Sequence, residues 1–166
     1  MKVPGIRYLV FAAWMVLFLS SCSRNIKETT INNLNAPHKI VIASNGSDFR
    51  DNIREKVIKK YSDNCYIEVI NLDKLQTVEY DRYDAILVMD AIIAWGGFNP
   101  EMKNYIDSLS DNKKVVLFLS AGDEELKYSY KGVDAISSAS VVEEEDKIVQ
   151  EITGKIDKLL LESMSD

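Results

Sequence analysis

Hydrophobic runs alternate with amphipathic stretches along most of this chain, as strands alternate with helices in an α/β domain. The runs 85–89 and 115–120 are almost continuously apolar, which is typical of strands covered on both faces in a parallel sheet. The final run is shorter and more polar, as expected at a sheet edge. The pattern predicts five strands, over residues 39–44, 66–72, 85–89, 115–120 and 134–140.

Apolar residues at helical spacing occupy the stretches between several of these strands. Residues 49–61 carry such a stripe, Pro100 suits the first turn of another helix, and residues 142–162 form an amphipathic closing helix. Strands joined through helices run parallel. We therefore predict one α/β domain over 38–166, a three-layer, doubly wound, five-stranded parallel sheet in the order 2-1-3-4-5.

The first 21 residues have the pattern of an export signal. Lys2 and Arg7 precede a 12-residue apolar run, which is short for a membrane span, and the run ends in Leu-Ser-Ser before Cys22. This ending resembles the lipobox of bacterial lipoproteins, which implies cleavage after residue 21, a lipid on Cys22 and a place in the bacterial cell envelope, facing outside the cytoplasm. The alternative is an ordinary secretory signal with an incidental cysteine. The polar stretch 22–37 is predicted to be a tether.

Charge and composition exclude several function classes. Removal of Lys2 and Arg7 leaves 18 basic and 26 acidic residues, so the mature chain has a net charge of −8 and should repel nucleic acid. His38 is the single histidine, which excludes a histidine metal cluster and argues against a histidine-dependent triad. Cys65, inside an apolar run, is predicted to be a core residue, with a reactive thiol as the alternative.

Small and polar residues follow three of the predicted strands, at the sheet edge where open α/β folds bind ligands. The first strand leads into Ser44, Asn45, Gly46 and Ser47. The other two lead into glycine-containing loops, with the candidate residues Trp95, Gly96, Gly97, Ala121, Gly122, Asp123 and Tyr128.

Residues 39–161 resemble the flavodoxin family, most closely over the stretch YDAILVMDAIIAWGGFNPEMKNYIDSL. The resemblance implies non-covalent FMN, with Trp95 stacked on the flavin, Gly96 and Gly97 allowing close approach, and the loop 121–123 and Tyr128 on the other side. The Ser44–Ser47 loop would then hold the phosphate. Asp48 and Phe49 depart from the family pattern, and a helix N-cap is the alternative role for Asp48. Arg50 could offset its charge.

The resulting functional expectation is a membrane-tethered FMN protein that transfers electrons to a redox protein or a quinone. Its rival is a flavin-free binding or assembly module at the envelope. A hydrolase using Ser44 or Ser120 lacks the Gly-x-Ser-x-Gly elbow, and no catalytic residue is assigned. The stretch 134–140 only faintly resembles a covalent FMN-attachment signal, since Ser138 replaces its glycine.

Overall fold

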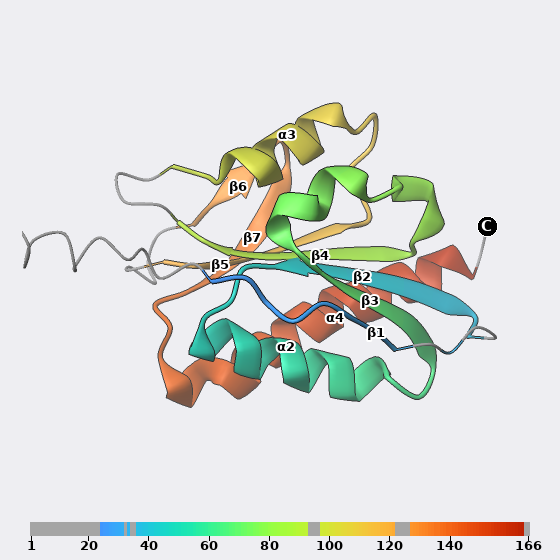
Figure 1. Ribbon diagram of the computed structural model, residues 1–166, viewed down its shortest axis with the longest axis horizontal. Helices are drawn as coiled ribbons and strands as arrows, with labels where there is room; N and C mark the ends of the chain where they lie inside the picture. The colour runs from blue at the N-terminus through green and yellow to red at the C-terminus, as the bar shows by residue number, and fades with distance from the viewer. Residues whose placement is uncertain (1–23, 32, 34–35, 93–96, 122–126, 165–166) are drawn as a thin grey trace, which may run out of the picture.

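The computed structural model describes residues 24–31, 33, 36–92, 97–121 and 127–164 (Figure 1). Over these residues the chain forms one seven-stranded sheet in the order β1-β3-β2-β4-β5-β7-β6. The strands are β1 (Thr29–Ile31), β2 (His38–Ser44), β3 (Cys65–Asn71), β4 (Ala85–Ala91), β5 (Val115–Ser120), β6 (Ser129–Tyr130) and β7 (Val133–Ser138). The helices are α2 (Asp48–Tyr61), α3 (Pro100–Ser108) and α4 (Glu145–Ser163), with 3-10 turns η2 (Leu72–Thr77), η3 (Tyr80–Arg82) and η4 (Val142–Glu144).

The predicted order of the parallel strands is confirmed. Strands β3, β2, β4, β5 and β7 pair in parallel, and in chain order this arrangement is 2-1-3-4-5. The prediction of five strands is wrong in number, because two short antiparallel strands are added. Strand β1 pairs with β3 at one edge, and β6 pairs with β7 at the other.

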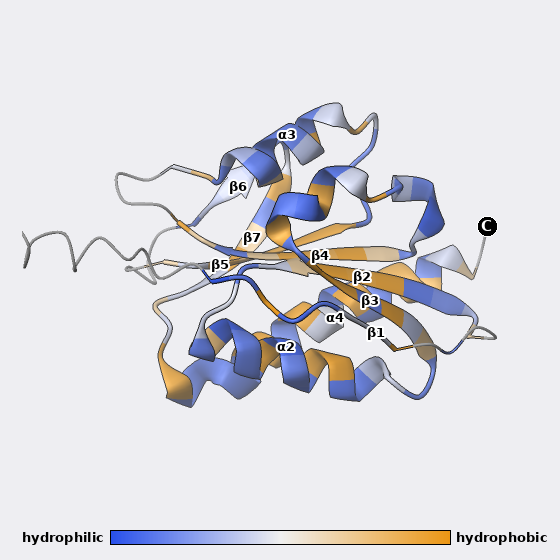
Figure 2. Ribbon diagram, viewed as in Figure 1, coloured by the Kyte–Doolittle hydropathy of each residue, from blue (hydrophilic) through white to orange (hydrophobic). Residues whose placement is uncertain are grey.

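Helices cover both faces of the sheet, so the domain has two apolar cores. Helices α2 and α4 lie on one face, and α3 with η2 lies on the other (Figure 1). The apolar residues of the central strands run almost unbroken through the middle layer (Figure 2). Helices α2 and α4 are also joined by the Tyr61 hydroxyl, which donates to the Thr153 carbonyl at 3.0 Å and to Asp157 at 2.6 Å.

The N-terminal segment corrects the prediction of a tether over 22–37. Residues 24–31, which we call the N-terminal strap, lie on the domain and end in β1. Ile26 is 8% exposed and belongs to the core, and its backbone exchanges hydrogen bonds with the Asn71 side chain at 2.7 and 3.2 Å. Glu28 accepts from Asn71 and pairs with Lys74 at 2.7 Å.

The predicted signal peptide and Cys22 lie outside the described residues, as does Ser23. No helix in the described part of the chain has both the length and the apolar character needed to cross a bilayer.

Candidate ligand site at the carboxyl edge of the sheet

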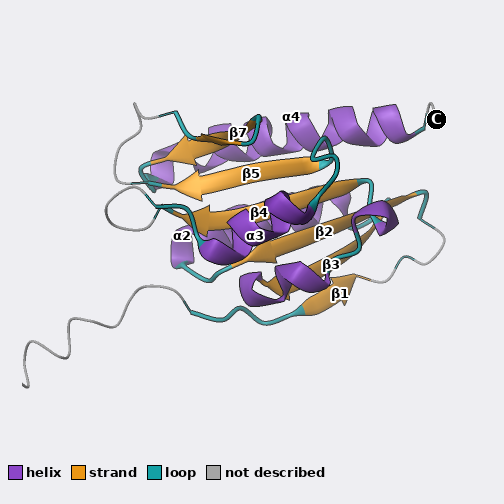
Figure 3. Cartoon of the chain, turned by 90° about the horizontal axis from the view of Figure 1, so that it is seen from above, coloured by secondary structure: helices purple, strands orange, loops and turns teal. Residues whose placement is uncertain are grey.

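Parallel strands end together at one edge, which we call the carboxyl edge; the edge where they begin is the amino edge (Figure 3). At the carboxyl edge, Asn45 donates to the Met89 carbonyl at 3.4 Å, and Ile92 donates to the Ser120 carbonyl at 2.9 Å. The Ala121 amide donates to the Ser138 carbonyl at 2.7 Å. The predicted site residues after β2 and β5 thus lie at the same edge of the sheet, at the ends of two strands separated by β4.

The other predicted residues fall into two groups. Gly97 is exposed, and Tyr128 packs edge-on against Phe98, with ring centroids 6.4 Å apart. Tyr128 therefore contributes to the core on the α3 side. The remaining candidates lie outside the described residues: Trp95, Gly96, Gly122 and Asp123.

Helix α2 begins at the loop that was predicted to hold phosphate. Ser47 is its N-cap, with extended backbone and a side chain that accepts from the Arg50 amide at 3.2 Å. The alternative of an Asp48 N-cap is therefore wrong, because Asp48 is already in the first helical turn and its side chain is 91% exposed. Ser44 is fully buried, and its hydroxyl donates to the Asn45 carbonyl at 2.9 Å.

The backbone of Arg24 pairs with this loop. The Gly46 amide donates to the Arg24 carbonyl at 2.6 Å, and the Arg24 amide donates back at 3.4 Å. A β-carbon on residue 46 would lie 2.9 Å from the Arg24 carbonyl oxygen and 2.6 Å from its Cγ. Glycine is thus needed at this position for the approach of the protein's own strap.

The Arg24 side chain lies at the start of α2, where a phosphate would be expected. Its guanidinium pairs with Asp48 at 3.0 Å and with Asp51 at 2.5 Å. Burial raises the pKa of Asp51, but hydrogen bonds from Arg24 and Arg54 outweigh burial, and the net effect is a lowered pKa. Two carboxylates and a strap carbonyl therefore surround the N-terminus of this helix.

The Arg50 side chain is buried under the loop and hydrogen-bonded to it. It is 4% exposed and reaches across to β5, where its Nη1 donates to the Ser120 hydroxyl at 2.7 Å. Its Nε donates to the Asn45 carbonyl at 3.0 Å, and its Nη2 donates to the Gly46 carbonyl at 3.4 Å. Arg50 thus fixes the loop that follows β2 to the end of β5, on the far side of β4.

Asp90 is a polar residue of this edge that the sequence reasoning missed. It is 4% exposed at the end of β4, and its Oδ1 accepts from the Asn45 side chain at 3.2 Å. Its Oδ2 has no hydrogen-bond partner in the described part of the chain. Burial raises the pKa of Asp90, against the opposing effects of the Ala91 amide, Asn45, Arg50 and Asn99. A lone acid directly after the apolar run 85–89 was the signal that could have found it.

A small polar cavity of about 210 Å³ lies at the same edge. Its lining includes two carboxylates and two amides, from Asn45, Leu72, Asp73, Asn99 and Glu101. Carboxylates accept hydrogen bonds and attract cations. The chemistry of this edge therefore suits a ligand group that donates hydrogen bonds or carries positive charge.

The described residues of the loop do not fit an FMN phosphate. A phosphate dianion at the start of α2 would need free amide donors and would meet the carboxylates of Asp48 and Asp51. The amide of Gly46 instead donates to Arg24. Ser138, which replaces the glycine of the covalent-attachment signal, is fully buried, and its hydroxyl accepts from the Ser140 amide at 3.1 Å.

A catalytic pair of Ser44 with the single histidine is excluded by the positions of these two residues. His38 begins β2 and Ser44 ends it, so they lie at opposite edges of the sheet, about 20 Å apart at a rise of ~3.3 Å per residue. Nδ1 of His38 lies 3.4 Å from the Ser163 hydroxyl and 3.7 Å from Asp84, at the amino edge. Among the described residues, no cluster of histidine, cysteine and acidic side chains could hold a metal ion.

Comparison with known proteins yields structural similarity alone. No family model matches the chain, and no curated protein matches it. Oxidised flavodoxin 2 from Bacillus cereus aligns at 18% identity with a TM-score of 0.49, over 72% of this chain and 98% of its own. Oxidised flavodoxin 1 from the same organism aligns at 14% identity and 0.46, over 72% and 97%. In this chain, the order of the five parallel strands, 2-1-3-4-5, is that of a flavodoxin-like fold.

Proposed function

We propose that this protein is a lipid-anchored binding module of the bacterial envelope, built on a flavodoxin-like fold and working without FMN. The observation that carries the proposal is the pairing of Arg24 with Gly46. This pairing uses a loop amide that a phosphate would need, and the Arg24 guanidinium is held by two acids at the start of α2.

The ligand class follows from the polar groups of the carboxyl edge. Asp73 and Glu101 line the small cavity. Asp90 is buried nearby, and its Oδ2 has no hydrogen-bond partner among the described residues. A cationic or hydrogen-bond-donating group, on a small molecule or on a protein partner, complements these oxygens. An anionic ligand would be repelled by them and by the net charge of the mature chain.

The test is a fluorescence titration of FMN with the mature chain, residues 22–166, carrying a serine at the anchor position (Cys22→Ser). We expect no saturable quenching of flavin fluorescence up to tens of micromolar protein, with riboflavin as a control that lacks the phosphate. One-to-one quenching at micromolar concentration, lost in Trp95→Ala, would overturn the proposal.

The second candidate is FMN-dependent electron transfer to a redox protein or a quinone. It is favoured by the sequence of the two loops that follow β4 and β5, which carry Trp95-Gly96-Gly97 and Ala121-Gly122-Asp123. Bound FMN would supply the redox chemistry, and the chain would supply ring stacking and an acidic surround. This candidate requires the strap to leave Gly46, so a strap-opening variant should bind FMN more tightly than the native chain.

The anchor itself has a separate test. Expression of the full precursor in a bacterial host should give a membrane-bound product whose N-terminal peptide carries acyl chains on Cys22. The Cys22→Ser variant should lose the lipid mass. An unmodified Cys22 in the native product would overturn the envelope-anchor part of the proposal.

A further inference from the structure

We propose that the strap holds the carboxyl edge of the sheet against the membrane, so that this edge faces a lipid surface and the amino edge faces away from it. The inference rests on the lipid anchor at Cys22 in the proposed function. It does not depend on whether the ligand of the edge is a flavin.

The first step is the attachment of the strap. Arg24 is held at the carboxyl edge by its backbone pairing with Gly46 and by its ion pairs with Asp48 and Asp51. The strap then continues through the buried side chain of Ile26 into β1. Motion of residue 24 away from the edge would have to break this whole set of contacts.

The second step is the length of chain between the strap and the anchor. Only Ser23 lies between Cys22 and Arg24, and the two Cα–Cα steps between these residues span at most about 7 Å. The acylated residue is therefore confined near the carboxyl edge whatever path the chain takes. The amino edge is farther away by the length of the strands, about 20 Å from the first to the last residue of β2 at a rise of ~3.3 Å per residue.

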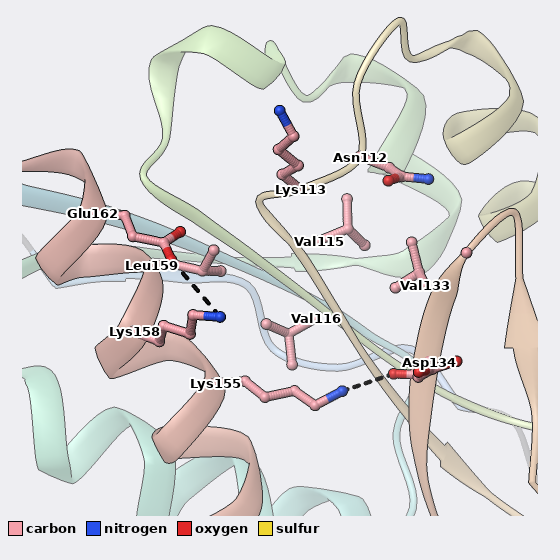
Figure 4. Close-up of a pocket in the computed structure, with 11 residues that line it drawn as sticks. Asn112, Lys113, Val115, Val116, Val133, Asp134, Lys155, Lys158, Leu159 and Glu162 are labelled. Carbon is pink, nitrogen blue, oxygen red and sulfur yellow. Dashed lines mark hydrogen bonds and ion pairs between the residues drawn. The ribbon is translucent and has the colours of Figure 1, made fainter. Parts of the chain in front are cut away.

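The third step is the distribution of charge, which gives the amino edge little attraction of its own for a membrane. The amino edge carries a groove of about 510 Å³ between the sheet and α4, lined in part by Val116 and Leu159 (Figure 4). Lys113, Lys155 and Lys158 line this groove together with two acids, Asp134 and Glu162. Lys158 pairs with Glu162 at 3.8 Å, and Lys113 pairs with Asp111 at 3.3 Å, so most of this basic charge is balanced locally.

The anchor should therefore decide which edge faces the membrane. Acyl chains in the bilayer hold residue 22 permanently at the surface, and this high effective concentration outweighs the weak attraction of a few exposed lysines. The inference is testable, because a chain whose edge is not held by the strap should show no preference for either edge.

The experiment places one fluorophore on cysteine at either edge of the lipidated full chain, in Asp73→Cys or Lys113→Cys. The buried Cys65 serves as the labelling blank. The proteins are reconstituted in phosphatidylcholine vesicles with and without brominated lipid, which quenches nearby fluorophores. We expect at least threefold stronger quenching of the label at 73 than of the label at 113. Equal quenching, or stronger quenching at 113, would overturn the inference.

A twenty-residue Gly-Ser insertion between Ser23 and Arg24 is the matched control. It keeps the lipid and the fold but releases the edge, so the difference between the two labels should disappear. If the difference survives the insertion, the strap does not set the orientation and the inference is overturned. Mass spectrometry of the same samples separates this result from failure of the anchor, which would appear as unmodified Cys22.

Discussion

The backbones of Arg24 and Gly46 pair at the start of α2, with the Gly46 amide 2.6 Å from the Arg24 carbonyl oxygen. The contact joins residues 22 positions apart and closes the strap over the loop that a bound phosphate would use. A β-carbon on residue 46 cannot be accommodated without displacement of the Arg24 backbone. The glycine of this loop thus serves an internal contact.

Gly46→Ala should release the strap. The added methyl group meets the carbonyl oxygen and the Cγ of Arg24, and overpacking of this kind costs about 1–3 kcal/mol in the free energy of unfolding. Hydrogen exchange should show faster exchange for the amides of residues 26–31 than in the native chain. Gly154→Ala is the control, because no atom lies within 4 Å of its added β-carbon and the helical site favours alanine. Unchanged exchange in the strap of Gly46→Ala would contradict the assignment.

Asp90→Asn should stabilise the protein at pH 7, by about 1 kcal/mol, because it removes a buried charge whose Oδ2 lacks a described partner. Burial raises the pKa of Asp90 above its unfolded value of 3.8, so the folded state binds the proton more tightly. Ionisation therefore costs stability once the pH exceeds the raised pKa. The advantage of the variant should shrink as the pH falls towards 4, which urea unfolding at several pH values can measure. A destabilised variant at pH 7 would show that the charge is needed.

Two buried tyrosine hydroxyls should respond differently to removal. Tyr61→Phe deletes hydrogen bonds that join α2 to α4 and should cost about 1–2 kcal/mol in the free energy of unfolding. Tyr105→Phe is the matched comparison, because its hydroxyl is buried without a partner in the described part of the chain. Thermal unfolding should show a lower midpoint for the first variant and an unchanged or higher midpoint for the second. Equal losses would refute the assigned role of Tyr61.

Glu28→Gln should loosen the strap in a pH-dependent way. Hydrogen bonds from Lys74 and Asn71 lower the pKa of Glu28 to about 2, from an ordinary value of 4.5. A lowered pKa stabilises the fold above the ordinary value, and this contribution is lost as the pH falls through about 2. The native chain should therefore be more stable than the variant by the largest amount above pH 5, and the two should be equally stable near pH 2. Glu55→Gln, at an exposed position of α2, provides the baseline; a constant difference across this range would exclude the ionic contact.

The parallel part of the fold could be predicted because apolar runs and helical stripes report burial directly. Strand β1 could not, because Thr29–Ile31 carries little apolar pattern and forms a strand only where β3 offers an unpaired edge. The same limit applies to Ile26, a single apolar residue in a polar stretch. Its burial depends on the tertiary contacts of Asn71, 45 residues away.

The sequence predicted that the polar residues gather at the carboxyl edge of the sheet, but it predicted some of their contacts wrongly. Ser44 and Ala121 lie at the carboxyl ends of strands, as the alternation of strands and helices predicts. The direction of Arg50 was not predictable, since an arginine in the first turn of a helix is ordinarily exposed. The buried guanidinium of Arg50 donates to the hydroxyl of Ser120, which lies 70 residues away on β5.

The burial of Cys65 has a consequence for the proposed place of the protein in the cell envelope. If Cys22 is acylated, Cys65 is the sole remaining thiol; it is 1% exposed, and burial raises its pKa to about 11. The thiolate that reacts with disulfides is then scarce at neutral pH. The folded chain should persist in an oxidising compartment without forming mixed disulfides or covalent dimers, and its vulnerable interval is the time between export and folding.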